Sequence, residues 1–582
     1  MYGDSDCSMT FDYIVCGGGT SGCVIASILA SRLNASFLLV EAGRDTGVAP
    51  DVLVPGKYLH QLETDSEGLW HLPTVPQKEL EDRSILFLRG KQLGGSSAVN
   101  YMALARGPAS DYDEWADLTE DDQWTWENTL PLMKELEDFR PSRPSGFEHY
   151  AEPDPSCHGQ DGPLKVGFGD VMSPGVELFC RACKEVGIPL CLDNNAGNPI
   201  GVGLAQFNTR DGIRSYSANA FLSDETRQKL PNLTVLTNTC VDQIVFEEQR
   251  AKGVKLFHIS DNSTSEVLCR KEVIVCQGTF GSPQLLMLSG VGPKESLEHL
   301  GIRCIVDNQN VGQGMLDHSI LTIEYQTNEE GPAHNQIFAD PELLAKADAQ
   351  YAKDRTGAHN VYGTSGSVAF PKIRRLFDSS EFEKLDQKTQ RFMLESTRPS
   401  AEIWLGSGPA AFGEVRAGDT YMTHELLLQN NLSKGSVSLQ SANPREPPRI
   451  DPRFLEHPFD KRIAIETVRE AVAIGRSSAY QSVIRCMVHG PEADDDESIL
   501  RFIRATLGQG YHSLGTCRMG PSTKAGTVVD QYFKPIGTQG LRVADLSVCP
   551  ILTSNHTQIN VYLIGKRCAD AIVRDFHSSS LI

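Results

Sequence analysis

The chain has 582 residues, too many for one compact hydrophobic core, so we expect two to four domains. Apolar residues make up 40% of the chain and charged residues 22%, which is typical of a folded globular protein and excludes an intrinsically disordered one. The formal net charge is −21, from 54 basic and 75 acidic residues. Nucleic acid and anionic membranes are therefore excluded as expected partners, because a polyanion would be repelled at long range.

The N-terminus and the cysteines indicate where the protein works. The first ten residues, MYGDSDCSMT, lack the basic and apolar regions of a secretory signal, and no apolar run of about 18 residues could span a membrane. The 15 cysteines are scattered and odd in number, which favours reduced thiols. Cys180 and Cys183 form a CxxC without a second pair nearby, so we assign them to helix packing and expect no metal site. The sequence predicts an intracellular, cytoplasmic protein.

A dinucleotide-binding pattern lies between Phe11 and Arg44. A short apolar run leads into a GxGxxG turn, a helical pattern and a second apolar run that ends in Glu41. The three glycines are Gly17, Gly19 and Gly22. We expect the first to permit a tight turn, the second to leave room for a pyrophosphate, and the third to let the helix pack against the strand. Glu41 stands where an acid can accept hydrogen bonds from the adenosine ribose.

A second glycine turn occurs in LFLRGKQLGGSSAVNYMALARGP, residues 86–108. Gly94 and Gly95, followed by serines and Asn100, predict a hydrogen-bonding loop that can approach a ligand. Taken alone, the pattern fits an ordinary turn before a helix equally well. Residues 111–137 then have a helical pattern.

The rest of the chain alternates between strand-like and helical patterns. Strands are expected at 233–236, 243–247, 253–258 and 272–276, and again at 541–550, which carries Asp545. Long helical patterns cover 459–476 and a C-terminal stretch to about Asp575. Residues 332–424 have no glycine fingerprint, and we expect them to belong to a second domain that shapes a pocket.

Seven motifs occur in order along nearly the whole chain. They are the glycine fingerprint with Glu41, RGKQLGGSSAVNYM (89–102), GSPQLLMLSGVGP (281–293), VGQGMLDH (311–318), YHSLGTCRMG (511–520), LRVADLSVCP (541–550) and SNHTQINVYLIGKRCADAI (554–572). Together they resemble the glucose-methanol-choline (GMC) family of FAD oxidoreductases, and within it the aryl-alcohol oxidase and formate oxidase branches. The resemblance implies an α/β fold, with a Rossmann-like FAD-binding domain and a second α+β substrate domain of sheet and helices. The FAD domain would comprise residues 1–155, 205–320 and 505–582, and the substrate domain residues 156–204 and 321–504.

The resemblance also implies which residues hold FAD. The ADP half would be held by Gly17, Gly19, Thr20, Ser21, Gly22, Glu41 and the backbone of Val241. The flavin half would be held by Gly94, Gly95, Asn100, Met102, Asp545, Thr557 and Gln558. The last two would lie at a helix N-terminus, whose partial positive charge suits the negative charge of a reduced flavin. Some family members bind the flavin covalently through a histidine four residues before the LGG leucine. Arg89 stands there in this chain, so we expect non-covalent FAD.

The chemistry implied by the family requires a base beside flavin N5 to take the proton of an alcohol, and histidine suits this role. His512 and His556 align with the catalytic pair of the family. We expect His512 to be the base and His556 to hydrogen-bond the substrate oxygen, although the resemblance leaves open which of the two takes the proton. His318 is expected to be a structural hydrogen bonder. Formate oxidases place an arginine where this chain has His556, so an alcohol is a better substrate than a carboxylate.

We therefore predict an FAD-dependent alcohol oxidase or dehydrogenase that acts on an activated primary alcohol of aryl or furanyl type. Oxygen or another electron acceptor would reoxidise the flavin. A lyase or cyclase in a biosynthetic pathway, with structural FAD and the same histidines in acid/base roles, stays open as an alternative, as does a flavin-retaining binding protein without turnover. The oligomeric state is also left open.

Overall fold

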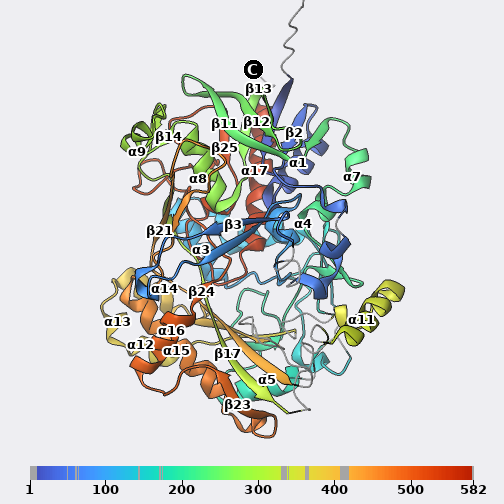
Figure 1. The fold of residues 1–582 in the computed structure, drawn as a ribbon, viewed down its shortest axis with the longest axis vertical. Helices are drawn as coiled ribbons and strands as arrows, with labels where there is room; N and C mark the ends of the chain where they lie inside the picture. The colour runs from blue at the N-terminus through green and yellow to red at the C-terminus, as the bar shows by residue number, and fades with distance from the viewer. Residues whose placement is uncertain are drawn as a thin grey trace, which may run out of the picture.

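The computed structural model describes residues 9–48, 50–58, 62, 65–141, 145–169, 172–173, 175–328, 337, 340–360, 366–406 and 419–579. Residues 1–8, which carry most of the N-terminal pattern discussed above, lie outside the described residues. Figure 1 shows two sheets at opposite ends of the longest axis of the molecule. No helix in the described ranges is long and apolar enough to cross a membrane.

The first sheet joins the N-terminal fingerprint to a strand from near the C-terminus. Its strands run in the order β10 (Leu233–Leu236), β2 (Phe37–Val40), β1 (Thr10–Cys16), β13 (Ser263–Val275), β12 (Arg250–His258) and β11 (Thr239–Glu247), and β25 (Leu541–Val543) pairs with β13. β10, β2, β1, β13 and β25 pair in parallel, whereas β11, β12 and β13 form an antiparallel meander. β2, β25 and the C-terminal ends of β1 and β13 are buried, as expected for parallel strands covered on both faces, whereas β10 at the sheet edge is partly exposed. All the strands predicted between residues 233 and 276 are confirmed.

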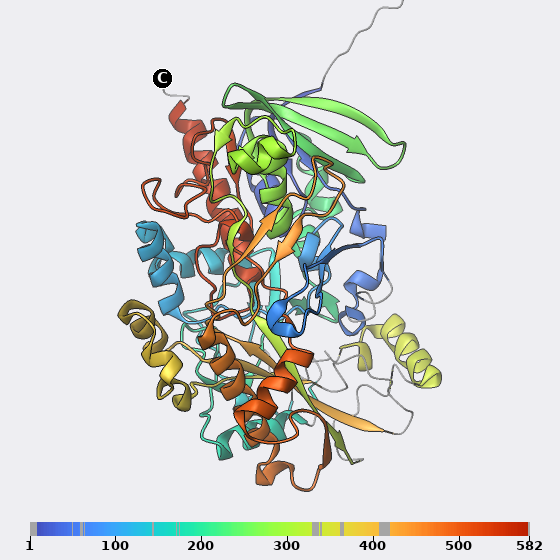
Figure 2. The same cartoon turned by 60° about the vertical axis from the view of Figure 1, so that its left-hand side comes forward.

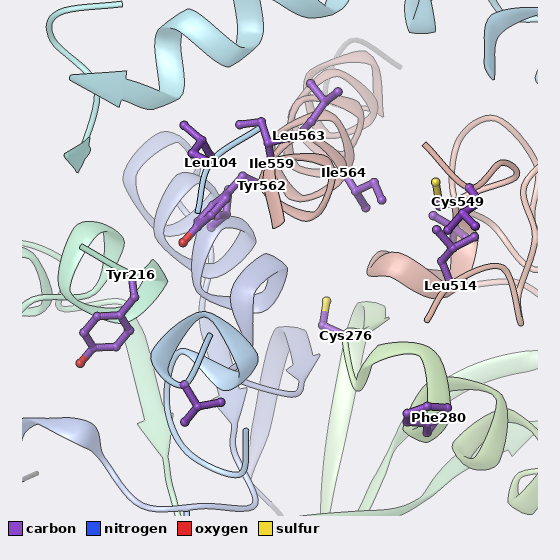
Figure 3. Packing of buried hydrophobic residues seen from close by; sticks show 14 of the residues in the cluster. Leu104, Tyr216, Cys276, Phe280, Leu514, Cys549, Ile559, Tyr562, Leu563 and Ile564 are labelled. Carbon is purple, nitrogen blue, oxygen red and sulfur yellow. The ribbon is translucent and has the colours of Figure 1, made fainter. Parts of the chain in front are cut away.

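Two helices from opposite ends of the chain pack on each other beside this sheet. They are α1 (Thr20–Arg32) and α17 (Gln558–Ser579). Gly565 permits the close approach, because a Cβ there would lie only 3.1 Å from the Ser21 carbonyl oxygen. In Figure 3, Tyr562 of α17 lies against α1. Figures 1 and 2 show α17 running from the top toward the middle of the molecule, so its N-terminus is brought near the first glycine turn.

The second sheet is antiparallel and is built from the middle of the chain. Its strands run β23 (Ile484–His489), β17 (Ser319–Thr327), β20 (Thr420–Leu428), β19 (Ala401–Gly406), β18 (Ser367–Phe370) and β7 (Gly201–Leu204), with β24 (Gly508–Gln509) beside β17. The helices α5 (Gly175–Glu185) and α15 (Pro458–Gly475) pack against it and against each other. A Rossmann-like unit and an α+β unit are thus both present, which confirms the predicted fold class. The exact domain boundaries stay a prediction.

Several elements differ from the predicted ones. The helical pattern at 111–137 is broken into α3 (Ala109–Thr119), a 3-10 turn at Asp122–Trp124 and α4 (Trp126–Leu136). The break follows Glu120, whose φ of 54° ends α3 in the left-handed region. Asp545 lies just beyond β25 instead of within it, and α17 continues to Ser579. Cys180 and Cys183 are buried in α5, where they contribute to packing as predicted.

Candidate functional site

A cavity of about 650 Å³ extends from the first glycine turn to one face of the second sheet. Both expected catalytic histidines line it, as do twelve of the fourteen residues expected to hold FAD. Those twelve are Gly17, Gly19, Thr20, Ser21, Glu41, Gly95, Asn100, Met102, Val241, Asp545, Thr557 and Gln558. The other two, Gly22 and Gly94, lie behind the cavity wall. The topology therefore gathers the predicted site residues around a single space.

The three fingerprint glycines have different structural roles. A Cβ on Gly17 would lie 2.4 Å from the Cys276 carbonyl oxygen, and one on Gly22 would lie 1.9 Å from the Gly17 carbonyl oxygen, so both positions require glycine for packing. A Cβ on Gly19 would meet nothing closer than 3.9 Å. Gly19 borders open space at the N-terminus of α1, where free backbone N–H groups favour a phosphate. The turn therefore fits the pyrophosphate of FAD.

The second glycine turn packs directly on the first. The Gly94 amide donates to the Gly18 carbonyl oxygen at 2.7 Å. Gly95 has a φ of 53°, and a Cβ on it would lie 2.7 Å from the Gly19 Cα atom. Gly95 lines the cavity, and Gly94 supports the loop from behind against the ring of Tyr216. The loop therefore lies at the cavity, and its contact with the ligand stays a prediction.

Glu41 is buried at the end of β2 and lines the cavity. Its Oε2 accepts from the Gly18 amide at 2.9 Å, and its Oε1 accepts from the Gly43 amide at 2.8 Å. The two hydrogen bonds lower the pKa of Glu41, but burial has the larger effect and raises this pKa to about 7. Each carboxylate oxygen has a second lone pair, so the group can still accept from a ribose hydroxyl.

The side chains of Asn100 and Gln558 are used within the protein. Asn100 Nδ2 donates to Gln558 Oε1 at 3.1 Å, and Gln558 Nε2 donates to the Ala103 carbonyl oxygen. Asn100 Oδ1 accepts from the amide of Met102, whose φ of 62° lies in the left-handed region. Because the first N–H groups of a helix have no intrahelical acceptor, the backbone at the start of α17 is what can meet a flavin pyrimidine edge.

Asp545 has a structural role as well as a place in the cavity wall. Its Oδ2 accepts from the Gly278 amide at 3.0 Å and from Ser282 Oγ at 2.5 Å, while Oδ1 accepts from the Ser547 amide at 2.8 Å. These bonds fix the start of α8 (Gly278–Leu288) to the loop after β25. A ribityl or pyrophosphate contact would therefore have to share the Asp545 carboxylate with three protein donors.

His512 and His556 face each other across one end of the cavity. Their ring centroids are 4.9 Å apart at an interplanar angle of 73°. His512 follows Tyr511, whose φ is 62°, and its backbone amide donates to Asp317 Oδ1 at 2.8 Å. The His512 Nδ1 atom is 2.8 Å from Nδ1 of the fully buried His318. His318 is thus a hydrogen bonder as expected, and its partner is the expected base itself.

The electrostatics of this end keep two imidazoles neutral. Burial, followed by the nearby His556, His318 and Arg89, holds the pKa of His512 well below its usual value. Burial also lowers the pKa of His318 to about 3. At neutral pH both rings are uncharged, so each has one N–H and one lone pair. A lone pair on His512 can take a proton.

His556 is held by a buried carboxylate that the sequence interpretation missed. His556 Nε2 is 2.6 Å from Oε1 of Glu402 in β19, and this oxygen also accepts from Trp404 Nε1. The other oxygen of Glu402 accepts from Gln429 Nε2 at 3.0 Å. The sequence signal that could have identified Glu402 is that it is an acid inside the otherwise apolar run AEIWLG. Glu402 is a positioning residue, because it acts through His556.

Arg89 occupies the position where some members of the family carry a flavin-linked histidine. Its Nη2 donates to Ser513 Oγ at 2.9 Å, and its guanidinium lies 5.3 Å and 5.1 Å from the ring centroids of Phe87 and Phe280. A guanidinium held this way remains charged and is no nucleophile for the flavin.

Known proteins are similar to this chain over the segments that form both sheets. Two family models described as GMC oxidoreductase match residues 11–320 and 431–565, which include the first glycine turn and both histidines. A glucose methanol choline oxidoreductase of Aspergillus terreus is 32% identical over 97% of this chain and 92% of its own. An alcohol dehydrogenase (acceptor) of Pseudomonas putida is 30% identical over 98% and 97%. This chain also superposes on the solved structure of a formate oxidase variant of Aspergillus oryzae RIB40, with a TM-score of 0.87 at 25% identity. The superposition covers 98% of this chain and 99% of that one, and the variant was studied for the modification of its FAD.

Proposed function

Because the chain belongs to the GMC family of FAD oxidoreductases, we propose that it oxidises an activated primary alcohol of aryl or furanyl type. As a member of that family it is an enzyme that acts on CH–OH groups with FAD. FAD, when bound, supplies the hydride acceptor. The observation that carries the proposal is the pair of imidazoles at one end of the cavity, each held by a different buried partner. Oxygen or another acceptor as the oxidant, and a cytoplasmic location, stay predictions.

The proton of the alcohol goes to His512 in this proposal. For Nε2 to accept it, the ring must carry its own hydrogen on Nδ1, which then donates to Nδ1 of His318 at 2.8 Å. His318 must in turn carry its hydrogen on Nε2, a buried atom with no hydrogen-bond partner among the described residues. In this arrangement His318 accepts the Nδ1 hydrogen of His512 and leaves Nε2 of His512 available to take the proton.

His556 stabilises the oxygen from which the proton leaves. Its Nε2 donates to Glu402, so Nδ1 is the nitrogen left for the substrate. A protonated ring donates from both nitrogens at once, to the carboxylate and to the alkoxide-like oxygen. The division of roles follows from the partners, since Nε2 of His556 faces the Glu402 carboxylate, whereas Nδ1 of His512 faces a second imidazole, His318.

The cavity wall supports a flat, apolar substrate. Tyr101, Ile320, Trp404 and Leu427 line the end that holds the histidines. A small carboxylate substrate would need a free guanidinium for bidentate binding. Among the described lining residues, Arg89 is engaged with Ser513 and Arg445 with Asp242 at 2.8 Å. We also infer that FAD is held non-covalently, because Arg89 replaces the linking histidine.

Anaerobic mixing of the FAD-loaded enzyme with benzyl or furfuryl alcohol tests the proposal. We expect the oxidised flavin band to bleach, and a lyase or cyclase would leave it unchanged. In His512→Ala we expect the rate of bleaching to fall by about 10² to 10⁴, with FAD still bound. The matched control is His299→Ala, on the exposed end of α9 (Lys294–His299), which should bleach at the wild-type rate. A rate in His512→Ala within about tenfold of wild type would show that His512 is not the base.

A further inference from the structure

Glu425 lies on the sheet face that borders the cavity. It is in β20, where it pairs in register with Trp404 of β19. Because side chains alternate along a strand, Glu425 and Leu427 project to the same face of the sheet. Trp404, the direct partner of Glu425 on β19, projects to this face as well. All three side chains line the cavity, together with Ile320 from β17 on the other side of β20.

Three carboxylates project from this face of the sheet, those of Glu324, Glu402 and Glu425. Glu402 pairs in register with Leu427 and accepts from His556, Trp404 and Gln429. The side chain of Glu425 makes no hydrogen bond and no ion pair with any described residue, although its backbone belongs to the ladders with β17 and β19. The Glu425 side chain is partly exposed to the cavity, so a ligand that displaces water from it must supply a donor in exchange.

The surroundings of Glu425 place it at the substrate end of the cavity. Burial is the main cause that raises the pKa of Glu425 to about 7, and the nearby Glu324 and Glu402 act in the same direction. The nearby His556 acts in the opposite direction and lowers this pKa. Glu425 also contributes to the raised pKa of Tyr101, which is due mainly to burial. The Glu425 Oε1 atom lies 2.8 Å from where a Cβ on Gly406 would stand, so the absence of a side chain at Gly406 leaves room for this carboxyl.

We propose that Glu425 determines substrate specificity by accepting a hydrogen bond from a second donor group of the alcohol, a hydroxyl or amine carried by the same ring as the carbinol. The inference rests on the proposed alcohol oxidation, because His556 and Glu425 line the same end of one cavity. Glu402 fixes a catalytic side chain, whereas Glu425 contacts the remote part of the substrate. The two neighbouring acids therefore have separate roles.

Matched alcohols and two variants test this role. The probes are benzyl alcohols with a hydroxyl, an aminomethyl or a methoxy group at ring position 3 or 4, assayed by anaerobic flavin bleaching. The methoxy compounds have similar size and no donor. For wild type we expect a kcat/KM about 10- to 100-fold higher for a donor compound than for its methoxy counterpart. In Glu425→Leu this preference should vanish, mainly through KM, with wild-type FAD content.

Glu425→Gln separates the two kinds of donor. Its amide oxygen still accepts from a neutral hydroxyl, so the hydroxybenzyl alcohols should keep part of their advantage. The aminomethyl compounds should lose theirs, because the carboxylate charge is gone. Equal kcat/KM for donor and methoxy compounds in wild type, or an equal loss for both in Glu425→Leu, would overturn the role of Glu425. If no alcohol bleached the wild-type flavin, the failure would instead lie with the proposed alcohol oxidation.

Discussion

Gly95→Ala is expected to weaken FAD binding without changing any charge or any ligand group. A Cβ at this position would lie 2.7 Å from the Gly19 Cα atom, whereas carbon atoms in contact are about 3.5 to 4.0 Å apart. The two glycine turns must then separate by about 1 Å. Overpacking of this kind costs about 1 to 3 kcal/mol. Residue 95 also has a φ of 53°, which adds about 1 to 2 kcal/mol for a residue with a side chain.

Of these two effects, we expect only the separation of the two glycine turns to weaken FAD binding. Gly187→Ala is the matched control, because Gly187 has a φ of 92°, a Cβ added there would meet nothing within 4 Å, and the residue does not line the cavity. It carries the backbone strain without the clash. We expect the Kd for FAD, measured by quenching of flavin fluorescence on the apoprotein, to rise at least about tenfold in Gly95→Ala, which corresponds to about 1.4 kcal/mol. Gly187→Ala should change Tm alone. Wild-type affinity in a folded Gly95→Ala protein would refute the assignment of the turns to the pyrophosphate.

Two further substitutions test the acids around the cavity. Glu41 has its pKa raised to about 7, and ribose hydroxyls bind its ionised form, so the affinity for FAD should increase as the pH rises through 7 and level off above it. Glu41→Gln should bind FAD more weakly above pH 7 and show no such rise between pH 6 and 8; the same pH profile in both proteins would contradict the ribose contact. Glu402→Gln should slow flavin bleaching by about 10- to 100-fold and alter its pH profile, with FAD content unchanged, because the charge that holds His556 is removed. A variant with the wild-type rate and profile would show that Glu402 merely fills space.

The parts of the site that the sequence could predict are those encoded locally. Gly17, Gly22 and Glu41 follow a strand and helix pattern whose spacing is set by backbone sterics, so the dinucleotide cradle could be inferred from about thirty residues. The fold class was implied by the resemblance to the GMC family, whose motifs occur in order along the chain. His512 and His556 were found through motifs of the family and not through their geometry.

The parts that could not be predicted depend on long-range packing. The contact between His318 and His512 joins residues 194 positions apart, and Glu402 reaches His556 across 154 positions. Glu425 is one acid in a mostly buried strand, and its importance follows from register and from the lack of a side-chain partner among the described residues. Gln558 was expected to face the flavin, yet its amide is used by Asn100 and Ala103, which only the tertiary structure reveals.

The central claim is that one cavity holds FAD with His512 and His556 at its reactive end. The most direct test is an experimental structure of the FAD-loaded protein with a bound aromatic alcohol or inhibitor. The account predicts adenosine beside Glu41, the flavin ring beside Met102, and one substrate oxygen within hydrogen-bond distance of both His512 and His556. A dinucleotide bound elsewhere, or a substrate oxygen that neither histidine reaches, would contradict it.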